Sequence, residues 1–208
     1  MSVTIVNHPC LQHKITLLRD ASTENAAFRA LLLEVTQLLA YEATRTLPVE
    51  NVRIHTPLSD TSSPILSGRK PAVVALMRAG LGMADGILRL LPSAPLGHIG
   101  VYRDPETREA QTYYCKLPAD LEGRTVLVVD AVLATGNTAA AACDLLRKAG
   151  AGRLEYISVL AAPEGITHLQ AEHPDVSITC GHLDESLNED GFIVPGFGDL
   201  GRRLFGTA

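Results

Sequence analysis

Apolar residues recur at helical spacing in the first part of the chain and then fall into short runs. The helical recurrence comprises Phe28, Leu31, Leu32, Val35, Leu38 and Leu39. Such spacing places one apolar stripe on a helix, which Ser22 or Thr23 would cap at its start. Pro48 lies shortly beyond the expected end. Residues from about 1 to 50 are therefore predicted to form an N-terminal helical segment.

Beyond that segment, β-branched and aliphatic runs of strand length alternate with helical patterns. The expected strands are residues 72–76, 97–102, 125–129, 154–160 and 176–179. The expected helices are residues 83–91, 138–148 and 165–172. Because alternating strands and helices build right-handed βαβ units, we predict a single α/β domain over residues 1–208. Its mainly parallel, twisted sheet would be flanked by helices.

The alternation stops in the tail, residues 184–208. Its spaced residues Gly191, Pro195, Gly196, Gly198, Gly201 and Gly206 leave no room for a long regular element. Residues 196–201 match G-x-G-x-x-G, but the seven residues that follow are too few for a dinucleotide-binding helix and a later strand. We expect the tail to form a structured C-terminal hood over the domain.

Composition narrows the class of partner. The chain is 46% hydrophobic and 20% charged, and its net charge of −5 argues against broad binding to nucleic acid or to an anionic membrane. Neither a signal peptide nor a membrane span is recognisable, so a cytoplasmic location is expected. Without a C-x-x-C pair, the cysteines are expected to be reduced and buried. They are Cys10, Cys115, Cys143 and Cys180.

The sharpest chemical feature follows the strand expected at residues 125–129. Asp130 stands just past this strand and can accept hydrogen bonds from two adjacent sugar hydroxyls. Residues 134–138 open a helix, where backbone N–H groups and the helix dipole favour a phosphate. Thr135 and Thr138 add hydroxyl donors, and Gly136 permits positive φ. Taken singly, such residues merely end strands and cap helices; together they predict a phosphate loop. It is not a Walker loop.

This arrangement resembles the type I phosphoribosyltransferases, and among them the uracil phosphoribosyltransferases. Similar segments spread over nearly the whole chain: residues 8–9, 12–14, 17–20, 76–83, 97–107, 113–118, 161–165 and the tail. The resemblance implies binding of phosphoribosyl diphosphate. The implied contacts are Arg78, Arg103, Asp130, Ala131, Val132, Leu133, Ala134, Thr135, Gly136, Asn137, Thr138 and Asp199.

Two arginines follow expected strands. Arg78 stands beside Gly80 and Gly82, and its guanidinium suits two oxygens of a diphosphate, although an ordinary βα turn would look the same. Arg103 begins a polar stretch that runs to about residue 111. This stretch is either a solvated hairpin or a loop that closes over the diphosphate and excludes water.

By the same resemblance, the tail recognises uracil. Ile193, Gly198, Asp199 and Leu200 would contact the base, because backbone N–H and C=O groups can match its two carbonyls and its N–H. The alternative is a packed loop whose glycines serve turns alone. Mg²⁺ is expected to be held mainly through the substrate diphosphate, and no catalytic side chain or protein metal ligand is assigned.

The chain departs from the family pattern at a few positions. Ala131 and Val132 replace Pro-Met, Asn137 and Thr138 replace Gly-Ser, and Arg202 replaces an acid. Leu200 and these departures leave open a preference for another base, or a sensor that binds nucleotide without turnover. The N-terminal helical segment offers a spare apolar face, so a homodimer or homotetramer is expected. Activation by GTP, which occurs in some relatives, also remains open.

Overall fold

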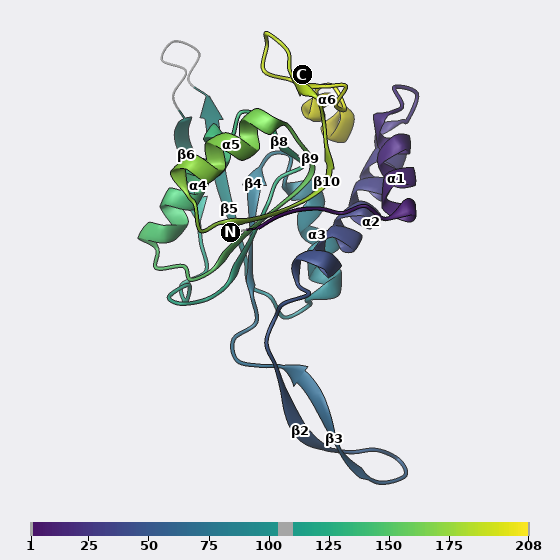
Figure 1. The fold of residues 1–208 in the computed structure, drawn as a ribbon, viewed down its shortest axis with the longest axis vertical. Coiled ribbons are helices and arrows are strands. Elements are labelled where there is room, and N and C mark those ends of the chain that lie inside the picture. The colour runs from purple at the N-terminus through teal and green to yellow at the C-terminus, as the bar shows by residue number, and fades with distance from the viewer. Residues whose placement is uncertain (1, 104–109, 208) are drawn as a thin grey trace.

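The computed structural model describes residues 2–103 and 110–207, with a parallel sheet at its centre (Figure 1). The sheet follows the order β1 (Val3–Ile5), β10 (Ser177–Leu183), β9 (Leu154–Ala161), β7 (Val126–Val129), β4 (Ala72–Met77), β5 (Leu96–Arg103), β6 (Ala110–Lys116). These neighbours pair in parallel except β6, which returns antiparallel to β5. The short β8 (Val132–Leu133) also pairs with β9. The predicted α/β architecture is confirmed.

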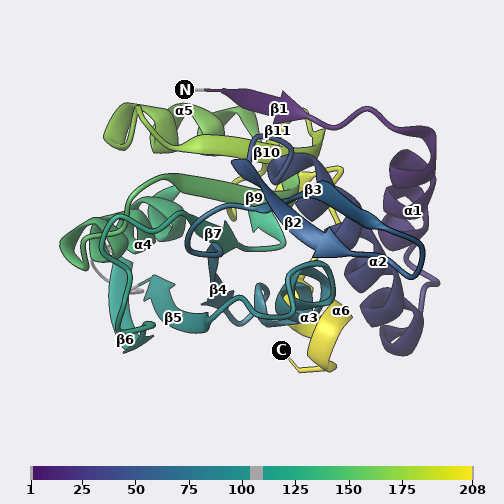
Figure 2. The same cartoon turned by 90° about the horizontal axis from the view of Figure 1, so that it is seen from below.

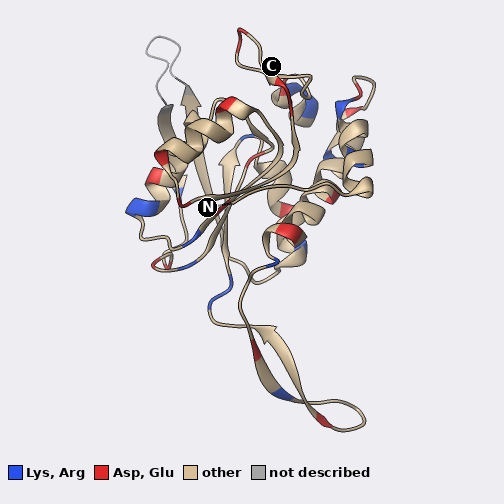
Figure 3. Ribbon diagram, viewed as in Figure 1, with Lys and Arg blue, Asp and Glu red and all other residues tan. Residues whose placement is uncertain are grey.

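Helices cover both faces of the sheet. One layer holds α1 (Pro9–Arg19), α2 (Asn25–Ala43) and α3 (Leu81–Leu90), and the other holds α4 (Asn137–Lys148) and α5 (Pro163–Glu172) (Figures 1 and 2). Each layer closes its own apolar core against the strands, whose aliphatic side chains alternate between the two faces. Both kinds of charge are dispersed over the two layers (Figure 3). No helix of the described chain is long and apolar enough to cross a membrane.

A hairpin missed by the pattern projects from the body. Its strands are β2 (Val49–His55) and β3 (Asp60–Leu66), which pair antiparallel with each other (Figure 1). All of their residues are exposed or only partly buried. The apolar alternation in β2 is limited to Val52 and Ile54, and β3 has none, so the pattern was too short to indicate a hairpin. The edge strand β1 was missed because it has only three residues, which is shorter than a recognisable strand pattern.

The caps and the cysteines correct two expectations. The helix α2 begins at Asn25, and the residue before it makes no side-chain cap. Thr23 instead donates its hydroxyl to the Leu17 carbonyl oxygen at 2.6 Å, within the turn that joins α1 to α2. All four cysteines are free, but Cys10 and Cys115 are exposed rather than buried. Apolar neighbours cover only the other two.

The tail contains more regular structure than its glycines suggested. Strands β11 (Ser186–Leu187) and β12 (Ile193–Val194) pair antiparallel, and a six-residue helix, α6 (Leu200–Phe205), follows. Asp199 caps α6 by accepting a hydrogen bond from the Arg202 backbone N–H at 2.9 Å. The tail rises above the carboxyl ends of the strands beside α1 and α2 (Figure 1).

Candidate active site

The predicted phosphate loop, residues 130–138, connects β7 to α4. Gly136 has φ +85° directly before α4, so the backbone turns left-handed at the position where the helix begins. A Cβ at this position would lie 2.9 Å from the Gly165 carbonyl oxygen and 3.1 Å from the His168 Cβ. Only glycine satisfies both the conformation and the space. The loop therefore presents its N–H groups at a helix N-terminus, as the sequence predicted.

Seven of the predicted phosphoribosyl contacts line one cavity of about 120 Å³, here called the phosphate-loop cavity. They are Asp130, Val132, Leu133, Ala134, Thr135, Gly136 and Thr138. Ala139 and Tyr156 complete its wall and were missed by sequence reasoning. The signal for Tyr156 was the alternation along its strand, which places every second residue on the α4 side. The cavity thus joins a carboxylate, two threonine hydroxyls, a tyrosine and a helix N-terminus.

Asp130 supplies the carboxyl group among the residues that line this cavity. Burial raises the pKa of Asp130 to about 7, and hydrogen bonds from the backbone of Ala131 and Val132 lower it in part. The side chain keeps partial exposure because it faces the cavity. Near neutral pH, its charge therefore depends on what occupies the cavity.

A second cavity of about 250 Å³, the tail cavity, lies beside the first and is mostly apolar. Three of the four residues predicted to contact the base, Ile193, Gly198 and Leu200, line this cavity, whereas Asp199 does not. Gly191, Phe192 and Phe197 also line it and were not among the predicted contacts. Val132 and Ala134 line both cavities. The aromatic side chains carried no periodic signal because the tail has no long helix or strand. The two predicted subsites therefore share a wall.

Arg78 contacts the last residues of the tail. It follows β4 through a cis Met77–Arg78 peptide bond, and it donates to the Thr207 hydroxyl at 3.1 Å. A Cβ on Gly201 would lie 2.9 Å from the Arg78 guanidinium and 3.0 Å from an Asp199 carboxylate oxygen. The fold therefore brings Arg78 and Asp199 to the same part of α6.

Gly80 sets how closely the turn after Arg78 approaches the phosphate loop. A Cβ at Gly80 would lie 2.3 Å from the Val129 carbonyl oxygen. No side chain fits there, so the β4–α3 turn packs directly against the end of β7. This close approach brings the arginine turn beside the strand that carries Asp130.

Three further predicted contacts are Ala131 and Asn137, which do not line the phosphate-loop cavity, and Arg103. Ala131 is buried in the core, and its carbonyl oxygen accepts hydrogen bonds from Val159 and Leu160. Asn137 is the first residue of α4 and does not line the phosphate-loop cavity; the positive φ belongs to Gly136. Arg103 ends β5, and its side chain and the predicted closing loop lie outside the described residues.

The fold is shared with structures whose sequences are only distantly similar. The adenine phosphoribosyltransferase from Thermoanaerobacter pseudethanolicus superposes with a TM-score of 0.55 at 12% identity, covering 83% of this chain and 99% of that chain. With the phosphate loop at the end of β7, this likeness defines a type I phosphoribosyltransferase fold. The AQ2163 protein from Aquifex aeolicus is far more similar, with a TM-score of 0.94, 32% identity and 99% coverage of both chains.

The sequence comparisons identify the family within this class. A family model described as uracil phosphoribosyltransferase matches residues 5–207. The uracil phosphoribosyltransferase of Paracoccus denitrificans is 52% identical, covering 99% of this chain and 97% of its own length. That of Clostridioides difficile is 50% identical, covering 99% and 98%. The chain belongs to the uracil phosphoribosyltransferase family.

Proposed function

We propose that this enzyme transfers the phosphoribosyl group of 5-phospho-α-D-ribose 1-diphosphate to N1 of uracil. The products are uridine monophosphate and diphosphate, as in pyrimidine salvage. The observation that carries this proposal is the wall that Val132 and Ala134 provide to both cavities. A ribose bound across this wall would have its phosphate in one cavity and a base against its anomeric carbon in the other.

The phosphate-loop cavity suits the 5-phosphate and the ribose. The N–H groups before α4 and the hydroxyls of Thr135 and Thr138 would donate to phosphate oxygens. The Asp130 carboxylate would accept from the two ribose hydroxyls. Arg78, and Arg103 by the family resemblance, would hold the diphosphate.

The tail cavity suits a small planar base. Phe192 and Phe197 offer apolar surface, and backbone groups of residues 193 and 198–200 would pair with the polar edge of uracil. A base with another hydrogen-bonding pattern would leave buried polar groups unpaired, which makes such a site selective.

The reaction is a displacement at the anomeric carbon. The bond to the diphosphate oxygen breaks and its electron pair leaves with the diphosphate, while uracil N1 forms the new bond and releases its proton. Orientation across the shared wall and stabilisation of the diphosphate charge by arginine would supply most of the acceleration.

Mg²⁺ is proposed as the cofactor. Among the described residues, no group of three or more His, Cys, Asp or Glu side chains is arranged to hold a metal ion. The one carboxylate of the phosphate-loop cavity, Asp130, fits an ion that arrives bound to diphosphate oxygens and waters. When bound, the ion neutralises charge on the leaving diphosphate.

A base panel tests the proposed function. The enzyme is incubated with phosphoribosyl diphosphate and Mg²⁺ and with uracil, cytosine, adenine, guanine or hypoxanthine in turn, and nucleotides are separated by chromatography. We expect uridine monophosphate to dominate. Turnover of another base in preference to uracil would reassign the tail cavity, and ligand binding without product would indicate a nucleotide sensor instead.

Assembly, regulation and location are further parts of the proposal. Most of the apolar side chains of α1 and α2 are buried within the chain, and Leu17 and Tyr41 remain exposed on these helices. The hairpin, with Val49, Ile54 and Ile65 exposed, is the better contact for a homodimer or homotetramer.

Activation by GTP is tested by adding GTP to the base panel and measuring the rate of product formation. Two exposed free cysteines support a reducing, cytoplasmic compartment.

A further inference from the structure

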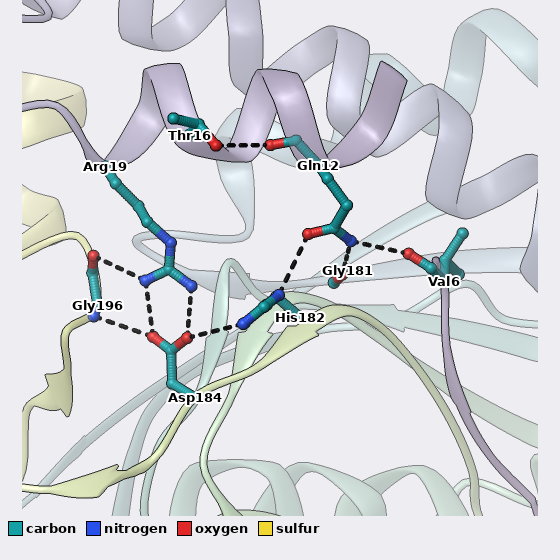
Figure 4. A network of polar contacts seen from close by, with 8 residues as sticks. All are labelled: Val6, Gln12, Thr16, Arg19, Gly181, His182, Asp184 and Gly196. Atoms are coloured by element: carbon teal, nitrogen blue, oxygen red, sulfur yellow. Dashed lines mark hydrogen bonds and ion pairs between the residues drawn. The ribbon is translucent and has the colours of Figure 1, made fainter. Parts of the chain in front are cut away.

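The carboxylate of Asp184, at the start of the tail, is buried and is held by Arg19 of α1 (Figure 4). The guanidinium donates to both carboxylate oxygens, and the Nη1–Oδ2 distance is 2.9 Å. The side chain of Asp184 is only 1% exposed. Leaving this buried carboxylate without its partner would cost free energy, so loss of either side chain should disturb the pair and the groups bound to it.

Both members of the pair also hold the backbone of Gly196. Arg19 Nη1 donates to the Gly196 carbonyl oxygen at 3.2 Å, and the Gly196 N–H donates to Asp184 Oδ2 at 2.9 Å (Figure 4). Gly196 lies between Ile193 and Gly198, two residues that line the tail cavity. The ion pair therefore fixes the backbone in the middle of the segment that forms the base site.

Arg19 contacts the same segment through an aromatic ring. Its guanidinium carbon lies 6.0 Å from the centroid of Phe197, which lines the tail cavity. Phe197 in turn packs edge-on against Phe28 of α2, with centroids 5.8 Å apart. One wall of the tail cavity thus rests on side chains of the two N-terminal helices.

The position of Arg19 is itself fixed by a second network on α1. Gln12 donates to the carbonyl oxygens of Val6 at 3.0 Å and Gly181 at 2.8 Å (Figure 4). Its own oxygen lies 3.2 Å from His182 Nδ1. Since Gly181 and His182 belong to β10, α1 is tied to the central sheet seven residues before Arg19.

The far end of the base segment is held from the same part of the chain. Asn25 donates to the carbonyl oxygens of Arg202 and Arg203 at 2.6 and 2.8 Å, and Arg29 donates to that of Leu204 at 2.7 Å. These bonds satisfy carbonyl groups of α6. Residues 197–201 therefore lie between two anchors, which are the bond from Arg19 to Gly196 and the bonds from Asn25 and Arg29 to the carbonyl oxygens of α6.

We propose that Arg19 and Asp184 are positioning residues for base recognition, acting through the backbone of residues 193–200. The proposal rests on the proposed function, because it assigns the base to the tail cavity. The pair sets the affinity for the base and leaves the phosphoribosyl subsite, which the β7–α4 loop forms, unchanged. Arg19 on α1 thus contributes to base specificity without contacting the substrate.

The test is a KM comparison on the full-length enzyme with the variants Arg19→Lys and Asp184→Asn. Lysine keeps the charge but cannot bridge both carboxylate oxygens and Gly196. We expect Arg19→Lys to raise KM for uracil about tenfold, which corresponds to roughly 1.4 kcal/mol. KM for phosphoribosyl diphosphate should change less than about twofold, because the other subsite is intact. If the pair only stabilised the fold, its substitution would lower the midpoint of unfolding but would not raise KM for uracil more than KM for phosphoribosyl diphosphate.

The matched control is Lys14→Met, which removes the partly exposed ion pair between Lys14 and Glu34. That pair also joins α1 to α2 and touches no tail residue. The Lys14→Met substitution should change neither KM for uracil nor KM for phosphoribosyl diphosphate. If Arg19→Lys fails to fold, Asn25→Ala tests the second anchor and should raise KM for uracil about threefold.

Values of KM for uracil within about twofold of wild type in every folded anchor variant would overturn the proposal. The wild-type base panel is run first, so the two proposals fail separately. If wild type prefers another base, the same split is measured with that base. If wild type gives no product, the dissociation constants of uracil and of ribose 5-phosphate replace the two KM values.

Discussion

At Asp130, folding and ligand binding make opposite demands on one carboxyl group. Burial favours the protonated form and raises the pKa of Asp130 to about 7, whereas two ribose hydroxyls are best accepted by the charged form. The proposed ligand restores the hydrogen bonds that burial takes away. The free energy of binding is therefore coupled to the protonation of this residue near neutral pH.

The stability of the free enzyme should report this protonation. Because the folded-state pKa lies above the unfolded value of 3.8, the stabilising contribution is complete below about pH 4 and is lost as the pH rises through about 7. Asp130→Asn should therefore exceed wild type in unfolding free energy at pH 8 by on the order of 2 kcal/mol, a value reduced for partial exposure. This difference in unfolding free energy between the variant and wild type should disappear near pH 4. Denaturant titrations at several pH values measure it, and a constant gap would contradict the assignment.

Gly136 permits a second prediction at the residue scale. Gly136→Ala adds strain at φ +85° and a contact with the Gly165 carbonyl oxygen, so the loop must move. We expect a loss of about 1–3 kcal/mol in stability and at least a tenfold rise in KM for phosphoribosyl diphosphate.

Gly123→Ala is the matched control for this change. Gly123 has φ +66° with nothing within 4 Å of an added Cβ. It should lower stability in a similar way and leave KM unchanged. An equal rise of KM in both variants would show that strain alone, and not the shape of the loop, is responsible.

Among the elements, the sequence predicted those that bury a regular face. The aliphatic run Val126–Val129 is fully buried, so its pattern indicated both a strand and the loop that follows. The hairpin buries neither face, and its sequence pattern did not predict strands. The site divides in the same way: the phosphate loop has local chemistry, whereas Arg19 and Asp184 meet across 165 positions of sequence. No local pattern encodes such a pairing.

The hairpin carries the prediction at this scale. Replacing residues 50–65 by a short turn should leave the circular dichroism spectrum of the body intact, because β2 and β3 pair with each other rather than with the central sheet. The assembly should dissociate to monomers if the hairpin forms the subunit contact. Light scattering after size exclusion measures the mass. A shortened enzyme that keeps the mass of wild type would refute this contact.

Across the whole molecule, elements from the N-terminal part of the chain hold its C-terminal part. β1 pairs with β10, α1 holds the start of the tail, and α2 packs beside α6. Phe28 of α2 sits under Phe197 and the Arg203 guanidinium, the latter 4.8 Å from the ring centroid. The tail is thus part of the core and not an appendage to it.

Phe28→Leu tests this unity. The substitution keeps most of the apolar volume but removes the aromatic and cation–π contacts, so the unfolding free energy should fall by about 1–2 kcal/mol. Unfolding should remain a single transition by both fluorescence and circular dichroism. Two separated transitions would show that the tail melts independently of the sheet.

The anchoring of the tail by residues 19–29 has a consequence for biosynthesis. A ribosome delivers Arg19, Asn25 and Phe28 early and their partners last, so the ring of Phe28 lacks its aromatic cover until the final residues have emerged. Throughout that interval, the ring of Phe28 leaves an apolar surface of the nascent chain uncovered. A product released before the tail is complete lacks the tail cavity, so translation that stalls within the tail yields a chain without the proposed base site.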